Sequence, residues 1–307
     1  MRTLRTLCLA WGVWLSASVA HAHQAATSGA AAAWTFDPWI TVPLAIAGVL
    51  FAVGWARLKR RSRLGAERLD RRALLFAAGW LALAGALVSP LHQAGERAFS
   101  AHMLEHELLM LVAAPLLVLS QPLSVMIWAF PAARRQGLGA AARWRPAAAI
   151  WRACTEPVTA TLAQAAALWL WHAPALFDLA LARNGWHIAQ HVSFLVTALL
   201  FWTAMLRPGP SRRGVAVLCL FATSVISGAL GALMAFSESP WYAGYAAMGM
   251  APFGLTAAED QQIAGLLMWI PGGLVHAAAA LILVGAALKA RPLLHEPANG
   301  TANAVQP

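Results

Sequence analysis

The sequence carries little charge for its length. Only 11% of its 307 residues are Asp, Glu, Lys or Arg and 60% are hydrophobic, whereas a typical soluble domain has roughly 25% charged residues. So few charged side chains cannot cover the surface of a water-soluble globule. The net charge is +10, but Lys and Arg lie in short runs between apolar stretches. This pattern indicates membrane topology and argues against a nucleic-acid partner.

Cysteine is also scarce. The three cysteines are Cys8, Cys154 and Cys219, and none belongs to a CxxC pair. Their spacing argues against a disulfide framework and against a thiolate metal site of the kind that copper(I) favours. The sequence has no phosphate-binding loop, no GxSxG motif and no Ser/His/Asp pattern. We therefore do not expect an enzyme.

The N-terminus has the three parts of a secretory signal peptide. A positively charged start precedes an apolar segment at 7–19, which is followed by the small-x-small motif Ala-His-Ala at 20–22. Cleavage after Ala22 would make residues 1–22 a signal peptide and residues 23–38 an exported segment. An uncleaved signal anchor is the alternative.

Seven apolar stretches follow, each near the ~20 residues that a helix needs to cross a bilayer. They lie at about 39–56, 73–89, 101–128, 158–172, 186–206, 215–235 and 263–288. Pro115 and Pro122 predict a bend in the third stretch, because proline removes a backbone donor. The predicted fold is an all-α polytopic membrane helix bundle of about seven spans, with one membrane domain at 39–288 and a tail at 289–307.

Lys and Arg concentrate in alternate loops. Eight lie in residues 57–72, five in 134–152, three in 207–213 and two in 289–291. The loops on the other side carry only Arg97 and Arg183, so the split is 18 to 2. The positive-inside rule places the basic side in the cytoplasm. We expect the mature N-terminus outside and the C-terminus in the cytoplasm, in agreement with an exporting signal.

Histidines gather at the outer ends of the predicted helices. His102 and His106 form one HxxxH pair in the third stretch, and His187 and His191 form another in the fifth. Residues four apart lie on one helix face, so the two pairs could supply four nitrogens to one metal cage, with His172 as a fifth. Imidazole suits copper, iron and zinc. The alternative is a set of interfacial polar residues that face headgroups or water.

Four further residues are weaker metal candidates. His276 lies about 20 Å along the last stretch at 1.5 Å per residue, where it would be a relay or a ring hydrogen-bonded to a neighbouring helix. Met268 lies about two turns above it, and Met103 lies inside the first HxxxH pair. Thioethers are soft ligands for copper(I), although a helical Met usually packs. His23, as a mature N-terminus, would offer an amine and an imidazole to copper.

Four segments carry a family resemblance. They are HMLEHELLMLVAAPLLVLSQPL (102–123), WHAPALFDLAL (171–181), HIAQHVSFLVTALLFW (187–202) and DQQIAGLLMWIPGG (260–273). In combination they resemble the CtaG-type assembly factors of caa3-class cytochrome c oxidase, over about residues 40–288. The family motifs fall on His102, His106, His172, His187, His191, Asp260 and Met268. The exported segment with His23 lies outside the resemblance.

The resemblance implies a process more securely than a reaction. It implies a multi-pass protein of the bacterial plasma (inner) membrane that is needed to form active oxidase and is linked to copper delivery. The expected partners are cytochrome c oxidase subunits and the lipid bilayer. The leading hypothesis is an assembly factor that binds copper at the outer face and hands it to a nascent oxidase subunit.

Three other functions remain open. A haem-binding membrane redox protein is the main alternative, because histidines on facing helices can ligate haem axially. A metal-dependent membrane hydrolase has less support, because the histidines lack an obvious partnered base. A transporter also has less support, because intramembrane acids are few.

Overall fold

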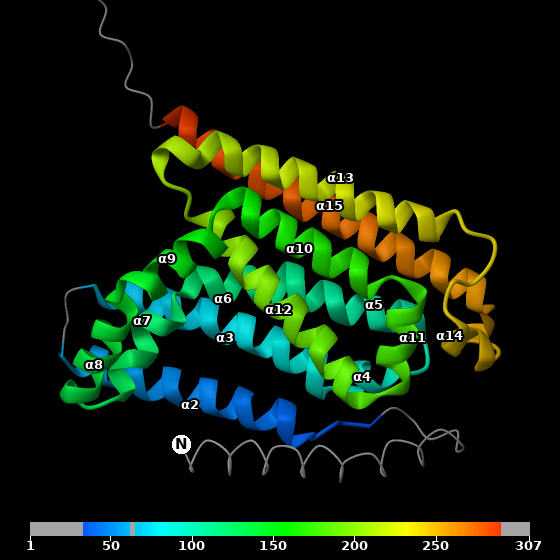
Figure 1. Cartoon of the computed structure of the whole chain (residues 1–307). Helices are drawn as coiled ribbons and strands as arrows, with labels where there is room; N and C mark the ends of the chain where they lie inside the picture. The colour runs from blue at the N-terminus through cyan, green and yellow to red at the C-terminus, as the bar shows by residue number, and fades with distance from the viewer. Residues whose placement is uncertain (1–32, 62–64, 290–307) are drawn as a thin grey trace, which may run out of the picture.

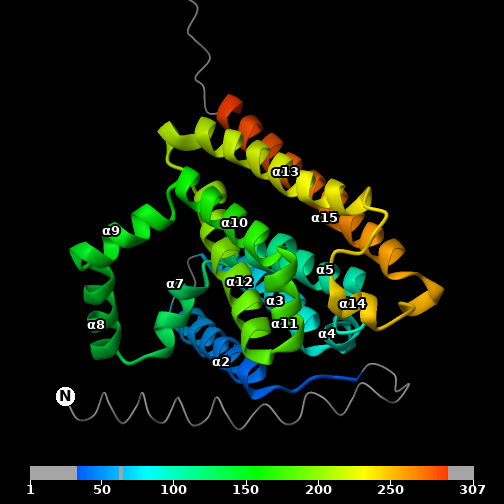
Figure 2. The same cartoon turned by 45° about the vertical axis from the view of Figure 1, so that its right-hand side comes forward.

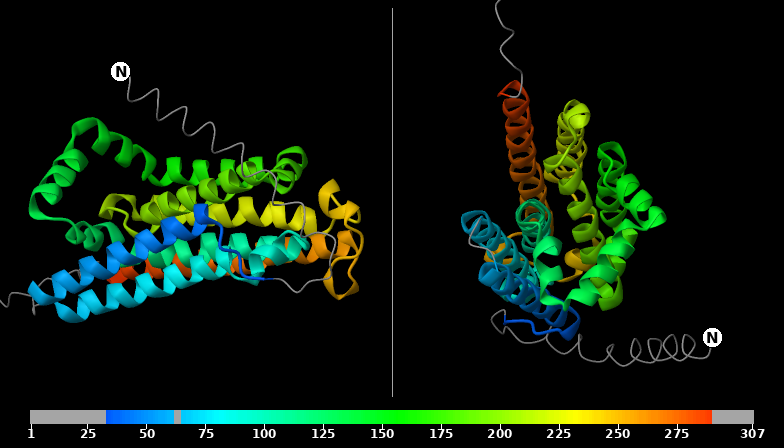
Figure 3. Two further views of the ribbon diagram at one scale, coloured as in Figure 1. Left: turned by 90° about the horizontal axis from the view of Figure 1, so that it is seen from below. Right: turned by 90° about the vertical axis from the view of Figure 1, so that its left-hand side faces the viewer.

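The computed structural model describes residues 33–61 and 65–289, and the described chain is a bundle of helices that run mostly along one direction (Figures 1 and 3). The long helices are α2 (Pro38–Arg61), α3 (Ala66–Val88), α10 (Pro157–Trp171), α12 (Asn184–Leu206), α13 (Arg213–Ala235) and α15 (Ala257–Lys289). The short helices are α4 (Pro90–Gly95), α5 (Phe99–Glu107), α6 (Ala114–Ser120), α7 (Pro122–Met126), α8 (Ala132–Arg143), α9 (Arg145–Cys154), α11 (Pro174–Ala182) and α14 (Ala243–Ala247). The predicted all-α membrane bundle is confirmed. The signal peptide and His23 lie outside the described residues.

Six helical segments are long and apolar enough to cross a membrane. A seventh span results if α10 and α11 count as one, since the two helices pass the same test together but meet at an angle of 73°. The number of spans therefore agrees with the seven apolar stretches. The bend between α10 and α11 follows His172, where Pro174 begins α11 and cannot continue the preceding helix.

The third span is broken in a way that its prolines only partly predict. A π-helical segment, η2 (Leu108–Ala113), joins α5 to α6 just ahead of Pro115. The sharp break comes at Gln121, whose φ of 54° is left-handed, and Pro122 then opens α7. A π turn widens a helix and often marks a functional site. The apolar stretch at 101–128 is thus several helical pieces rather than one bent helix.

Close helix packing depends on small residues. A Cβ on Gly265 of α15 would lie 2.4 Å from the carbonyl oxygen of Gly231 in α13, and a Cβ on Gly54 of α2 would lie 2.1 Å from that of Val125 in α7. Backbones that approach so closely exclude any larger side chain, as is usual between membrane helices. The span formed by α5, η2 and α6 is the most buried of the six, at 56% of its apolar window. This span lies at the centre of the bundle.

The two ends of the bundle differ. Figure 1 shows α4, α11 and α14 together at one end, beside the first turns of α5 and α15. Figure 2 shows α8 and α9 at the opposite end, projecting away from the other helices. The predicted histidine candidates from α5 and α12 lie toward the first end, whereas the arginines of α8 and α9 lie at the second. The fold therefore separates the histidines from the basic loops, as the charge pattern predicts.

Candidate metal centre

The start of α5 is fixed by an acid from another helix. Asp260 of α15 accepts a hydrogen bond of 2.6 Å from the backbone N–H of Phe99, and it also binds the backbone and hydroxyl of Ser100. These contacts satisfy free N–H groups of the first turn and place negative charge at its positive end. The cap of α15 itself is a capping box made by Thr256 and Glu259. Asp260 therefore holds α5 in position against α15.

Three histidines converge at this end of the bundle. The ligand nitrogens of His102, His106 and His191 all lie within 4.8 Å of one another, and all three residues are buried. The Nε2 atoms of His102 and His106 are 3.1 Å apart. Two nitrogens bound to one ion at about 2.0–2.1 Å would lie about 3.3 Å apart in tetrahedral geometry. The observed spacing therefore fits a shared metal ion.

A tyrosine determines which nitrogen of His102 is free. The hydroxyl of Tyr245 in α14 donates to the carbonyl of Gly95 at 2.5 Å and lies 3.1 Å from Nδ1 of His102. The single hydroxyl proton is used by the carbonyl, so Nδ1 of His102 must donate to the tyrosine oxygen. The lone pair of His102 is then on Nε2, the atom that faces His106. Tyr245 thus prepares His102 as a metal ligand.

His191 is prepared by its own helix and faces a carboxylate. Its Nδ1 donates to the carbonyl of His187 at 3.0 Å, so Nε2 keeps the lone pair. This Nε2 lies 3.0 Å from Oε1 of Glu105. The lone pairs of these two atoms repel each other at this distance unless a proton or a metal cation lies between them. His191 belongs both to the group with His102 and to a second possible group, with His92 and Glu105.

Glu105 connects the cluster to α4. The Nδ1 atom of His92 donates to Oε1 of Glu105 at 2.8 Å. Burial disfavours the charged form of His92, but the hydrogen bond to Glu105 and the negative charges of Glu105, Glu96 and Asp37 outweigh burial and raise the pKa of His92. His92 is therefore stabilised as a cation that pairs with the buried carboxylate. Partners of this kind orient metal-binding imidazoles.

His106 is the least satisfied ring of the cluster. It is 1% exposed, and its Nδ1 has no hydrogen-bond partner among the described residues. Its ring packs at 4.9 Å from the ring of His191 and at 4.8 Å from that of Phe194. A buried polar atom without a partner is costly. The ring is held by this aromatic packing and by the contact of its Nε2 with Nε2 of His102.

The other two predicted ligands of the outer helix ends, His187 and His172, lie next to the group of His102, His106 and His191 but are not part of it. His187 stacks on His92, with ring centroids 5.4 Å apart, and supplies its carbonyl to His191. His172 donates from Nδ1 to the carbonyl of Leu168 and directs Nε2 to the sulfur of Met103 at 3.4 Å. The ring of His172 is 6.5 Å from that of His106. His172 and Met103 thus form a neighbouring pair outside the group of three.

The deeper candidates line a separate cavity. His276 and Met268 both contribute to its wall, together with Glu107 from the end of α5. His276 donates from Nδ1 to the carbonyl of Gly272 within its own helix. Neither residue is in the groups of possible ligands formed with His191.

Three residues that contribute to this site were not predicted as metal ligands from the sequence. They are His92, Glu105 and Tyr245. His92 lies just after the second apolar stretch, but α4 is too short to show a helical period. Glu105 follows His102 by three residues and so shares its helix face, which was the available signal. Tyr245 gives no such signal, because it lies 143 residues away from His102 in sequence. Only the folded chain brings these residues together.

Comparison with known proteins identifies the family of the chain. The family model described as cytochrome c oxidase caa3 assembly factor (Caa3_CtaG) matches residues 49–290. The chain belongs to this CtaG family. The matched region contains each of the histidines described above, so the cluster lies within the CtaG domain. The CtaG chain is a multi-pass membrane protein by the length and composition of its helices.

Several curated relatives are mycobacterial. The chain is 27% identical over 244 residues to the uncharacterized protein Mb0105 of Mycobacterium bovis and to the uncharacterized protein MT0111 of Mycobacterium tuberculosis. It is 25% identical to the uncharacterized protein ML1998 of Mycobacterium leprae. Each match covers 77% of this chain but 36% of the relative, so the CtaG chain spans about a third of their length. No solved structure matches the chain.

Proposed function

We propose that this CtaG protein binds copper at the histidine end of the bundle and delivers it to a cytochrome c oxidase subunit during assembly. The observation that carries the proposal is the convergence of three buried imidazoles, His102, His106 and His191, within 4.8 Å. Buried histidines inside a membrane protein are costly and are usually functional. In this protein copper is cargo, bound and passed on, rather than a catalyst.

The donor set supports a bare metal ion over haem. The rings of His102 and His106 are 4.4 Å apart and belong to one helix, whereas axial haem ligands approach the iron from opposite faces. The rings of Phe177 and Phe194 pack against the cluster, which favours a small ion over a macrocycle. Haem remains the alternative prediction, and a visible spectrum of the purified protein tests it.

Copper is favoured among imidazole-binding metals by a neighbouring thioether. The sulfur of Met103, the residue after His102, lies 3.4 Å from Nε2 of His172, whose ring is 6.5 Å from that of His106. Sulfur and imidazole together suit copper(I), whereas carboxylate and water suit harder ions. The membership in an oxidase assembly family supports the same cargo.

The charge split supports an outward-facing site. The histidine end carries Arg97 and Arg183, while the opposite loops carry 18 Lys and Arg. By the positive-inside rule the histidine cluster faces outward from the bacterial inner membrane, with the C-terminus in the cytoplasm. Delivery would then take place at the outer face of the membrane.

The direct test is a copper(I) titration of the full chain in detergent against a coloured copper(I) chelator. Replacing His102, His106 and His191 together by Ala should remove one copper per protein. His295→Ala, in the C-terminal tail outside the described residues, is the matched histidine control and should leave binding unchanged. Unaltered stoichiometry in the triple variant would refute copper binding at this cluster.

A second test addresses the client. Cells that carry the triple variant as their only copy should produce oxidase with less copper per haem than cells with the unchanged chain. Normal copper content in the oxidase, together with loss of copper binding by the purified variant, would separate copper binding from delivery.

A further inference from the structure

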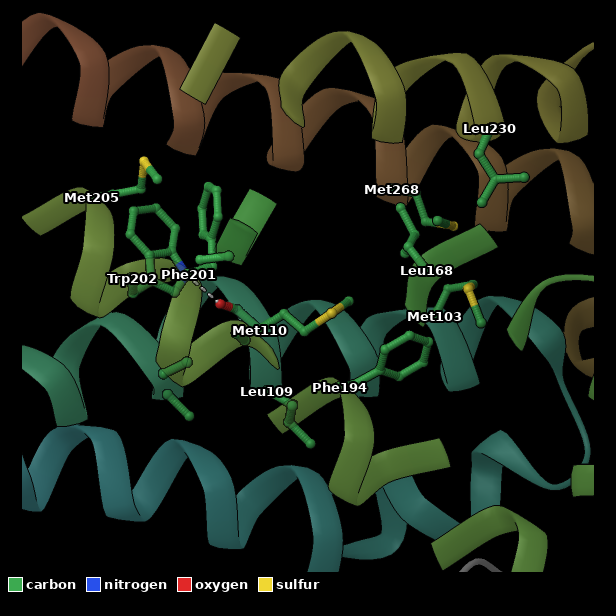
Figure 4. Packing of buried hydrophobic residues seen from close by; sticks show 14 of the residues in the cluster. Met103, Leu109, Met110, Leu168, Phe194, Phe201, Trp202, Met205, Leu230 and Met268 are labelled. Atoms are coloured by element: carbon green, nitrogen blue, oxygen red, sulfur yellow. Dashed lines mark hydrogen bonds between the residues drawn. The ribbon is translucent and has the colours of Figure 1, made fainter. Parts of the chain in front are cut away.

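Two helices of the described chain take no part in its core. The central helices pack through buried side chains such as Leu109, Phe194 and Trp202 (Figure 4). In contrast, no residue of α8 or α9 is buried, and Figure 2 shows both helices projecting from the end of the bundle opposite the histidines. We call residues 132–154, which comprise α8, α9 and the turn at Trp144, the α8–α9 arm.

The length of these two helices implies that another surface supports them. α8 has 12 residues and α9 has 10. Helices shorter than about 12–15 residues are marginal in water on their own, because most helical stability in proteins comes from packing of an apolar face. Neither helix buries a side chain against the described chain, so each needs a surface beyond it.

α9 separates its apolar residues from its basic residues. Ile150 and Trp151 share one side with Cys154, which follows them by four and three residues. Ile150 is 64% exposed and Trp151 is 52% exposed. Arg145 and Arg152, about two turns apart, lie on the opposite side. A helix with these two faces is typical of one that lies in the plane of a membrane interface, with Trp at the level of the headgroups.

The basic side of α9 and the end of α8 line an open hollow of about 580 Å³. The hollow is lined by Arg143, Arg145, Pro146, Ala148, Ala149 and Arg152, so every charged residue in its wall is an arginine. None of the three arginines forms a salt bridge within the part of the chain that the structure describes. Guanidinium groups bind phosphate oxygens through paired hydrogen bonds. The hollow therefore suits a phosphate group.

The basic segment at 57–72 is built differently. It contains Glu67 and Asp70 among its arginines, and Lys59 forms a salt bridge of 2.8 Å with Asp70. The α8–α9 arm has five arginines and no Asp, Glu or Lys. Its charge is not balanced within the arm, so an anionic surface is its electrostatic complement.

We propose that the α8–α9 arm lies on the membrane surface and binds anionic phospholipids, with a headgroup phosphate in the hollow of Arg143, Arg145 and Arg152. Ile150 and Trp151 then lie among the acyl chains. A helix of this kind sinks roughly 5–10 Å into the boundary between headgroups and acyl chains, so its basic side is level with the phosphates. A soluble phosphorylated partner would satisfy only the arginines, whereas a lipid surface satisfies both sides of α9. The proposal does not depend on copper binding.

The first test measures lipid binding by the full-length protein in detergent. Phosphatidylglycerol or phosphatidylcholine is added, and native mass spectrometry counts the lipids bound to each form. The arm variant carries Arg143→Gln, Arg145→Gln and Arg152→Gln. The matched control carries Arg60→Gln, Arg68→Gln and Arg71→Gln, which remove the same charge from exposed positions on α2 and α3.

We expect the unchanged chain to prefer phosphatidylglycerol, and the arm variant to bind it about 100-fold more weakly, from about fivefold for each arginine near an anionic surface. The control should keep the preference. An equal loss in the control, or equal binding of the two lipids by the unchanged chain, would overturn the proposal. A dimer that disappears only in the arm variant, without any lipid preference, would assign the arm to a second copy of the chain instead.

The second test locates the two sides of α9 in nanodiscs that contain phosphatidylglycerol. One fluorophore is attached to Cys154 on the apolar side, in a chain with Cys8→Ser and Cys219→Ala. A second chain carries Ala149→Cys and Cys154→Ser in addition, which moves the fluorophore to the basic side. We expect nitroxides on the lipid chains to quench the probe at Cys154 and aqueous iodide to quench the probe at position 149. Quenching of both probes by iodide alone would place α9 in water and overturn the proposal.

Discussion

The histidine cluster and the inner cavity treat their buried polar groups differently. At the cluster, hydrogen bonds orient three of the rings before any ligand arrives, because His102 donates to Tyr245, His92 to Glu105 and His191 to a backbone carbonyl. The ring nitrogens there that lack a hydrogen-bond partner within the described chain are Nδ1 of His106 and Nε2 of His187, besides the Nε2 of His191 that faces Glu105. In the cavity, Oε2 of Glu107 and the amide oxygen of Gln164 have no partner among the described residues. Pre-organisation lowers the cost of ordering a site when its ligand binds, so the cluster is the better prepared of the two.

The largest expected effect tests the role of the shared carboxylate. Glu105→Gln places an amide opposite Nε2 of His191, where it can donate to the lone pair that a metal would use. We expect the copper(I) affinity of the histidine cluster to fall about 100-fold, the upper range for lost supporting partners. Competition titration against a coloured copper(I) chelator measures the affinity. Glu238→Gln, an exposed acid between α13 and α14, is the control, and an equal loss there would contradict a specific role for Glu105.

The next effect concerns how α5 is held. Asp260→Ala leaves the buried N–H of Phe99 without its partner, so we expect the free energy of unfolding in detergent to fall by about 2 kcal/mol. Thermal unfolding followed by circular dichroism measures the change. Glu259→Ala removes the exposed cap of α15 and should cost under about 1 kcal/mol. An equal loss of unfolding free energy in the two variants would show that the contact of Asp260 with α5 stabilises the fold no more than an ordinary helix cap.

The smallest effect concerns the tautomer of His102. Tyr245→Phe removes the acceptor for Nδ1 of His102, so the proton is free to move to Nε2. We expect about a 10-fold loss of copper(I) affinity at the histidine cluster. Tyr242→Phe serves as the control, because Tyr242 contacts the carbonyl of His172 rather than a ring of the cluster. An equal loss in Tyr242→Phe would indicate general loosening of this end of the bundle.

Sequence reasoning was strongest where the signal is local. Apolar length predicted the spans, because a helix that crosses a bilayer needs a fixed number of residues. The HxxxH spacing predicted that His102 and His106 share a face, because the helical period is local too. Pro122 likewise predicted a bend, and the chain breaks at the preceding Gln121. The sequence could not predict the π segment at Leu108–Ala113, since this segment depends on packing and on partners such as Trp202.

The sequence by itself determined an all-helical membrane bundle, its charge asymmetry and the presence of histidine pairs at one end of the spans. These follow from composition and from periods shorter than two turns. Only the tertiary structure decided that His191, rather than His187 or His172, joins His102 and His106. It also decided that Glu107, Met268 and His276 share a cavity. The reason is physical: ligand sets depend on how separate helices rotate and pack against one another, and no local period encodes that rotation.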